Sequence, residues 1–205
     1  MNDFSVLMAL VDYIPVFFFI IGVVILNRDL YNKMTRTAFS LFAAGTTNVA
    51  IAGLLKATHK LLYAANICDF KTLTDMFFAT QAIGFMLAGL GLVLALMQKK
   101  DVIVAAAPAV FSGTFLFVTA MVLGLGAMNC CLSILAERLN KKKTIIFFAV
   151  SFVCSLMMGY LSSRDFSQSF MNWLAQGINI VSQGAFMTGV ISLHRAGLKD
   201  YSFNQ

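Results

Sequence analysis

From Val102 to Ala136 the chain reads VIVAAAPAVFSGTFLFVTAMVLGLGAMNCCLSILA, a run of 35 residues without a charged side chain. A single helix of that length would extend about 50 Å at ~1.5 Å per residue, whereas the hydrocarbon core of a bilayer is ~30 Å thick. The run is therefore either one long tilted helix with an interfacial extension or two short membrane spans that break near Ser112-Gly113. The choice between them decides the topology of the chain.

The bulk composition places the chain in a membrane. Of its 205 residues 60% are hydrophobic and only 12% are charged, and the mean hydropathy is +0.83; soluble domains carry about 25% charged residues. We predict an all-α polytopic membrane bundle that forms a single transmembrane domain over residues 1–205. The N-terminus lacks the basic n-region of a signal peptide, so we expect the first hydrophobic run to stay in the protein.

The positions of the basic residues favour seven transmembrane helices over six. With seven spans and the N-terminus outside, 11 of the 15 basic residues lie on the cytoplasmic side, which leaves Lys56, Lys60, Lys71 and Arg164 outside. Six spans give at best a 9 to 6 split of the same residues. Cytoplasmic loops are enriched in Lys and Arg. We therefore predict a multi-pass protein of the cell membrane with its N-terminus outside and its C-terminus in the cytoplasm, with six spans as the alternative.

Two basic turns between spans resemble each other in sequence. Ile25-Leu-Asn-Arg-Asp-Leu-Tyr-Asn-Lys-Met-Thr35 and Ile134-Leu-Ala-Glu-Arg-Leu-Asn-Lys-Lys-Lys-Thr144 share five of eleven positions. A weaker match aligns Gln81, Ile83 and Gly89 with Gln176, Ile178 and Gly184. These matches predict two three-helix repeat units, residues 5–97 and 114–194, joined by a short linking helix over 102–113 and held in the same orientation.

An arrangement of three, one and three helices with the N-terminus outside resembles the architecture of the SWEET sugar transporters. That family carries a proline in the first helix of each repeat. Here Pro15 lies in the first span, whereas Pro108 falls in the proposed linker. The resemblance is therefore one of topology, and no residue role is transferred from that family.

The last apolar run carries a stripe of amide side chains. Asn172, Gln176, Asn179 and Gln183 recur at steps of four, three and four, so they share one face of a helix. An amide that faces lipid leaves its donors and acceptors unmet, at a cost of roughly several kcal/mol. The stripe has two readings, namely interhelical packing worth ~1 kcal/mol per contact, or the wall of a polar substrate site.

Other polar residues reach similar depths if seven spans are correct. We expect Gln81 to line the same outward-accessible cavity as the stripe, with Asn48 nearer the middle of the membrane. Asp12 is the only acidic residue well inside a span, and intramembrane carboxylates are often functional. Asp12, His59 and Lys56 are candidates for ion or proton coupling, and the alternative is that Asp12 pairs with Lys56 or His59.

Several enzyme classes lack their residues in this sequence. The two histidines, His59 and His194, fall on opposite faces of the predicted topology, and the four cysteines contain no C-x-x-C pair. We expect no enzyme activity, metal or cofactor. The predicted function is a membrane transporter or facilitator for a small polar solute, expected to be neutral. The alternative is a non-transporting sensor, subunit or assembly partner. The expected partners are the lipid bilayer and the solute, not nucleic acid, and a homo-oligomer is left open.

Overall fold

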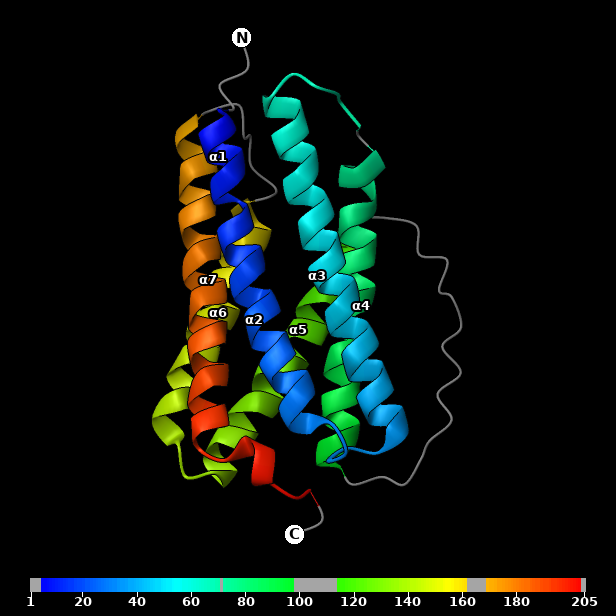
Figure 1. Cartoon of the computed structure of the whole chain (residues 1–205), viewed down its shortest axis with the longest axis vertical. Coiled ribbons are helices and arrows are strands. Elements are labelled where there is room, and N and C mark those ends of the chain that lie inside the picture. The colour runs from blue at the N-terminus through cyan, green and yellow to red at the C-terminus, as the bar shows by residue number, and fades with distance from the viewer. Residues whose placement is uncertain (1–4, 71, 98–113, 162–168, 204–205) are drawn as a thin grey trace.

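The computed structural model describes residues 5–70, 72–97, 114–161 and 169–203, and these form α-helices with two short 3₁₀ turns. A break at Asp12 divides the first rod of the bundle into α1 and α2 (Figure 1). The helices are α1 (Val6–Val11), α2 (Tyr13–Leu30), α3 (Arg36–Ala64), α4 (Thr72–Leu96), α5 (Thr114–Arg138), α6 (Ile145–Leu161) and α7 (Ser169–Arg195), with 3₁₀ turns η1 (Lys142–Thr144) and η2 (Leu198–Asp200).

Five helices of the described part are long and apolar enough to cross a membrane. They are Val6–Leu30, Arg36–Ala64, Met76–Leu96, Leu116–Arg138 and Lys142–Leu161. Helix α7 is also long enough, with 27 residues, but it carries four amides and is not one of these five. The described part of the chain is thus an all-α bundle of six long helices with five apolar candidate spans, typical of a multi-pass membrane protein.

The helix ends follow local signals in the sequence. The Thr35 hydroxyl accepts a hydrogen bond from the Ala38 amide at 3.3 Å and caps the start of α3. Asn32 and Asn140, in the turns after α2 and α5, have φ values of 61° and 56°, a left-handed conformation that asparagine tolerates better than most residues. Gly197 does the same after α7 with φ of 91°.

The six long helices form a closed ring. Each packs on its neighbours along the chain, and α7 returns to pack on α2 (Figure 1). Helix α4 lies very close to both α3 and α5, because a Cβ atom at Gly45 would come within 2.4 Å of the Ala88 backbone, and one at Gly124 within 2.4 Å of the Phe85 backbone. Small residues at these contacts let helices approach at the backbone, as is common in membranes.

Helices α4 and α5 end at the same end of the bundle. Gly91, near the end of α4, packs on Ala38 and Phe42 near the start of α3. Arg138, the last residue of α5, donates a 3.0 Å hydrogen bond to the Tyr201 hydroxyl, which follows α7. The Ser112-Gly113 pair, at which a break was expected, lies outside the described residues. The proposed linking helix, 102–113, lies outside them as well.

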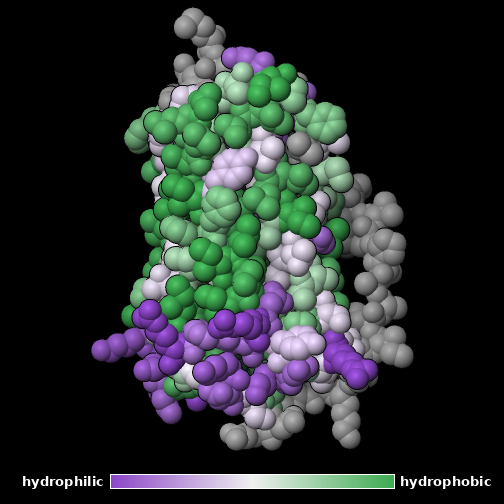
Figure 2. All heavy atoms as spheres, in the orientation of Figure 1, coloured by the Kyte–Doolittle hydropathy of each residue, from purple (hydrophilic) through white to green (hydrophobic). Residues whose placement is uncertain are grey.

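Most of the described basic residues lie at one end of the bundle, which we call the basic end. Figure 2 shows hydrophilic side chains in a band at this end and an apolar surface over much of the remaining length. Lys56 and Lys60 lie toward the opposite end. The basic end carries nine described Lys and Arg residues, namely Arg28, Lys33, Arg36, Arg138, Lys141, Lys142, Lys143, Arg195 and Lys199. Figure 1 places the two chain termini at opposite ends of the bundle.

Candidate functional site

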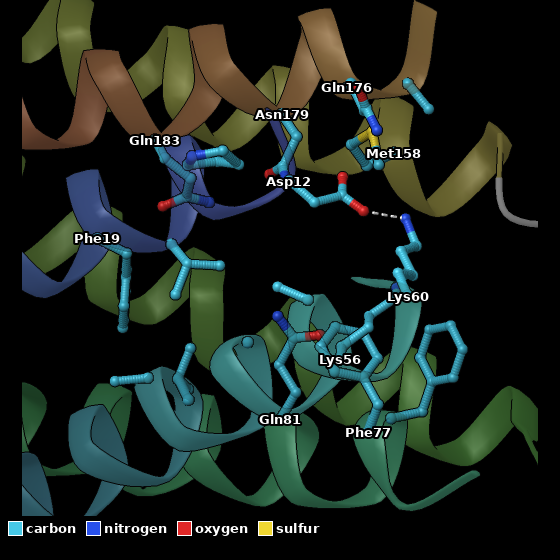
Figure 3. A pocket seen from close by; sticks show the side chains of 18 of the residues that line it. Asp12, Phe19, Lys56, Lys60, Phe77, Gln81, Met158, Gln176, Asn179 and Gln183 are labelled. Atoms are coloured by element: carbon cyan, nitrogen blue, oxygen red, sulfur yellow. Dashed lines mark hydrogen bonds and ion pairs between the residues drawn. The ribbon is translucent and has the colours of Figure 1, made fainter. Parts of the chain in front are cut away.

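A cavity of about 410 Å³ lies inside the ring, toward the end opposite the basic end, which we call the cavity end. It lies between α2, α3, α4, α6 and α7 (Figure 3). A smaller cavity of about 130 Å³ shares eight of its lining residues and adds Met121 and Leu125 of α5. The polar and charged residues of the larger cavity are Asp12, Lys56, Lys60, Gln81, Asn172, Gln176, Asn179 and Gln183.

The amide stripe of α7 lines this cavity along its whole length. Figure 3 shows Gln176, Asn179 and Gln183 on α7 directed toward the space that Gln81 of α4 enters from the opposite wall. The spacing of the stripe explains why its residues share one wall, since steps of four, three and four residues stay on one face of a helix. The structure thus brings together five of the six amides singled out as substrate-binding candidates.

Gln176 differs from the other amides because it is anchored to the protein. Its side chain is buried, and Nε2 donates a 2.8 Å hydrogen bond to the Met8 carbonyl of α1. Its Oε1 atom is also buried and has no hydrogen-bond partner among the described residues. This hydrogen bond joins α1 to α7, so the NH₂ group of Gln176 contributes to helix packing.

Three of the amides keep their hydrogen-bonding groups available. Within the described residues, Gln81, Asn179 and Gln183 make no hydrogen bond to the protein, although all three line the cavity. Amide groups without partners inside an apolar bundle are stable only where water or a ligand meets them. The wall formed by these three residues therefore suits a polar occupant.

An ion pair stands beside the amides. Asp12, at the break between α1 and α2, pairs with Lys60 of α3 (Figure 3). The Lys60 side chain is 30% exposed and that of Asp12 is 13% exposed, so solvent reaches the pair from the cavity end. The partner of Asp12 is thus Lys60, and not Lys56 or His59 as the sequence suggested.

Lys56 enters the cavity one helical turn before Lys60. Its ammonium nitrogen lies over the Phe77 ring, 3.8 Å from the centroid, and 5.6 Å from the centroid of Phe78. The negative face of each ring attracts the cation. Lys56 therefore rests on the aromatic wall of α4 and makes no ion pair with a described carboxylate.

An aromatic cluster bounds the cavity toward the basic end. Phe19 and Phe85 line the cavity, and the ring centroid of Phe19 lies 5.5 Å from that of Phe186 and 6.1 Å from that of Phe85. Beyond this cluster the ring of helices is filled with fully buried side chains such as Leu26, Phe42, Leu92, Leu132, Phe148 and Leu193. The cavity therefore reaches from the cavity end only as far as the middle of the bundle.

Two of the predicted site residues lie away from the cavity. Asn48 is half-buried on α3, but the lining residues of this helix are Val49, Ala50, Gly53 and the residues that follow them at helical spacing. His59 lies one residue before Lys60, and its Nε2 is 3.3 Å from Asp69 Oδ1. A step of one residue turns a helix by about 100°, which explains why Lys60 faces the cavity and His59 does not.

The sequence reading missed the aromatic and second cationic members of the site. Lys60 was expected only to lie on the outer side of the membrane, and its spacing of four residues from Lys56 was the available signal for a shared helix face. Phe19, Phe77 and Phe85 gave no signal, because phenylalanine in a membrane span faces lipid, core and cavity alike.

Comparison of the chain with protein-family models, with curated proteins and with solved structures finds no match. The geometry of the cavity is therefore the basis for a functional proposal.

Proposed function

We propose that this protein is a small membrane transporter or facilitator that binds a small polar solute in the cavity. One observation carries the proposal: Gln81, Asn179 and Gln183 line a cavity of about 410 Å³ with hydrogen-bonding groups that no described part of the protein uses. Ligand cavities usually have volumes of roughly 300–1,000 Å³ with a few convergent polar groups. Charged and polar residues inside membrane helices commonly mark substrate pathways.

The directions of the helices support seven membrane crossings. Helices α4 and α5 are parallel, since both end at the basic end, and two parallel spans that follow each other require one more crossing between them. We propose that the linking helix expected over 102–113, outside the described residues, supplies this crossing. The nine basic residues at the basic end then face the cytoplasm, and the cavity opens to the outside.

The directions in which the helices run also support two repeat units in parallel orientation. In each proposed unit, α2 to α4 and α5 to α7, the first and third helices run toward the basic end and the second runs back. Thr35 and Thr144, which the sequence alignment matches, each directly precede the second helix of their unit. Gln81 and Gln176, from the third helices, line the cavity from opposite sides. Repeats related by an axis along the membrane normal occur in several transporter folds.

The second candidate is a non-transporting module in which the stripe packs helices. The hydrogen bond from Gln176 to the Met8 carbonyl favours it. The two proposals make different predictions for Asn179, the next amide of the stripe. Asn179 makes no hydrogen bond to a described group, so the transporter proposal assigns it to the solute, whereas the packing proposal requires it for assembly.

Replacement of Asn179 by leucine separates the two proposals. We expect Asn179→Leu to leave the melting temperature of the purified protein within a few degrees of wild type and to abolish the melting shifts that small polar solutes produce. Asn48→Leu is the matched control, since it removes an amide outside the cavity and should keep those shifts. If Asn179→Leu instead prevents stable assembly without any dependence on solute, the stripe is structural and the transporter proposal fails.

A further inference from the structure

We infer that the cavity accepts a small organic anion, such as a carboxylate on a short apolar body. This inference rests on the proposed function and names the substrate class of that site. It starts from the charges in the cavity wall. The described lining contains one carboxylate, on Asp12, and two ammonium groups, on Lys56 and Lys60. The described wall therefore carries a net charge of +1, the sum of two positive groups and one negative group.

The excess positive charge belongs to Lys56. Asp12 is already engaged by Lys60, whereas Lys56 makes no ion pair with a described carboxylate and lies against Phe77. A cation–π contact attracts an ammonium group only modestly, while removal of the same group from water carries a larger cost. The rings alone do not offset the cost of the charge, so the site is most stable when an anion lies beside Lys56.

The rest of the wall defines the body of such an anion. Gln81 lines both cavities together with Lys56 and offers amide N–H donors to a carboxylate. Phe19, Phe77 and Phe85 provide an apolar surface, and Asn179 and Gln183 face it from α7. The amides alone suggested a neutral solute. With the two lysines in the same wall, the arrangement suits a molecule with one anionic group and an apolar remainder.

Reaction rates at a cysteine placed in the cavity test the sign of its charge without knowledge of the natural solute. The protein carries serine in place of Cys68, Cys130, Cys131 and Cys154, together with Ala50→Cys in the cavity wall, and is reconstituted in phosphatidylcholine nanodiscs. Its labelling rates are measured with methanethiosulfonate reagents that carry a sulfonate or a trimethylammonium group. Each rate is divided by that of the same reagent with 2-mercaptoethanol. We expect the sulfonate reagent to be favoured about tenfold.

A charge series in the wall makes this test specific. Asp12→Asn should increase the preference for the sulfonate reagent, and Lys56→Gln should reduce it to near one. Lys199→Gln, which removes an exposed lysine at the basic end, should leave it unchanged. A preference for the cationic reagent overturns the anion inference, and so does a preference that stays the same in Asp12→Asn and Lys56→Gln. Either result leaves the proposal of a polar, water-accessible cavity intact. If neither reagent reacts at position 50, water does not reach the cavity, and the proposed function fails as well.

Protection experiments distinguish a soluble anion from a lipid headgroup. Benzoate should slow labelling at position 50, whereas benzamide, which has the same shape and no charge, should not. Protection by added phosphatidylglycerol without protection by benzoate would identify the anion as a lipid headgroup. Protection by neither, or equal protection by benzoate and benzamide, contradicts a site selective for anions.

Discussion

An aspartate lies at each end of α2, Asp12 just before its start and Asp29 next to its last residue, and the surroundings of the two differ. At the cavity end Asp12 pairs with Lys60, both side chains keep exposed surface, and amides without protein partners lie alongside. At the basic end the Asp29 side chain is only 1% exposed and its Oδ2 lies 2.7 Å from His194 Nδ1 of α7. The Arg28 Nε atom lies 3.7 Å from the other oxygen of Asp29. One end is built for contact with solvent, and the other is filled and closed.

The largest expected effect comes from the helix contacts of the closed half. A Cβ atom at Gly91 of α4 would lie 2.6 Å from the Ala38 carbonyl oxygen and 2.7 Å from the Phe42 amide nitrogen. We therefore expect Gly91→Leu to destabilise the bundle by more than ~3 kcal/mol. Gly177→Leu on α7 is the control, because nothing lies within 4 Å of its Cβ position. Circular dichroism during titration with sodium dodecyl sulfate measures both. Equal losses would contradict a tightly packed basic end.

The two aspartates should also differ in their contribution to stability. Asp29→Asn weakens a buried, charge-assisted contact to His194, and we expect a loss of about 1–3 kcal/mol. Asp12→Asn affects a partly exposed pair, for which roughly 0–1 kcal/mol is typical. Melting temperatures of the two variants, measured in the same detergent, check the order. A larger loss for Asp12→Asn would mean that the cavity end is held together by its ion pair.

The smallest effects lie within the amide stripe itself. Gln176→Leu removes the hydrogen bond to the Met8 carbonyl, so we expect a loss of ~1 kcal/mol and looser packing of α1. Gln183→Leu removes no described contact and should change stability by less. Hydrogen exchange of the amides in α1, followed by mass spectrometry, reads the difference. Equal exchange in the two variants would show that the Gln176 contact contributes nothing to the docking of α1.

Much of the site was predictable because polar side chains are rare in membrane helices. The regular spacing of Asn172, Gln176, Asn179 and Gln183 placed them on one face, and Gln81 was expected opposite them. What the sequence did not reveal was the rotation of α3. Lys56, His59 and Lys60 follow one another closely enough for any of them to meet Asp12, and only the packing of α3 against α4 selects Lys60.

The polar end of α3 is explained by the cavity. Lys56, His59 and Lys60 follow the apolar run at positions i, i+3 and i+4, a spacing that predicts a continuing helix. The helix continues to Ala64, since those lysines face the cavity and the cavity end rather than the hydrocarbon. The aromatic wall could not be identified at all, as the sequence contains 20 phenylalanines and their pattern does not separate cavity-facing rings from lipid-facing ones.

The closure of the ring between α2 and α7 has a consequence for biogenesis. Asp29 of α2 can contact His194 only after the last helix, α7, has been synthesised. The hydrogen bond from Gln176 of α7 to the Met8 carbonyl, which holds α1 in place, also waits for this helix. Because α7 carries four amides on one face, its insertion is favoured when the earlier helices offer these amides a polar groove. The first and last helices therefore complete each other, and a ribosome-bound chain that lacks its final helix contains neither a closed ring nor a finished cavity.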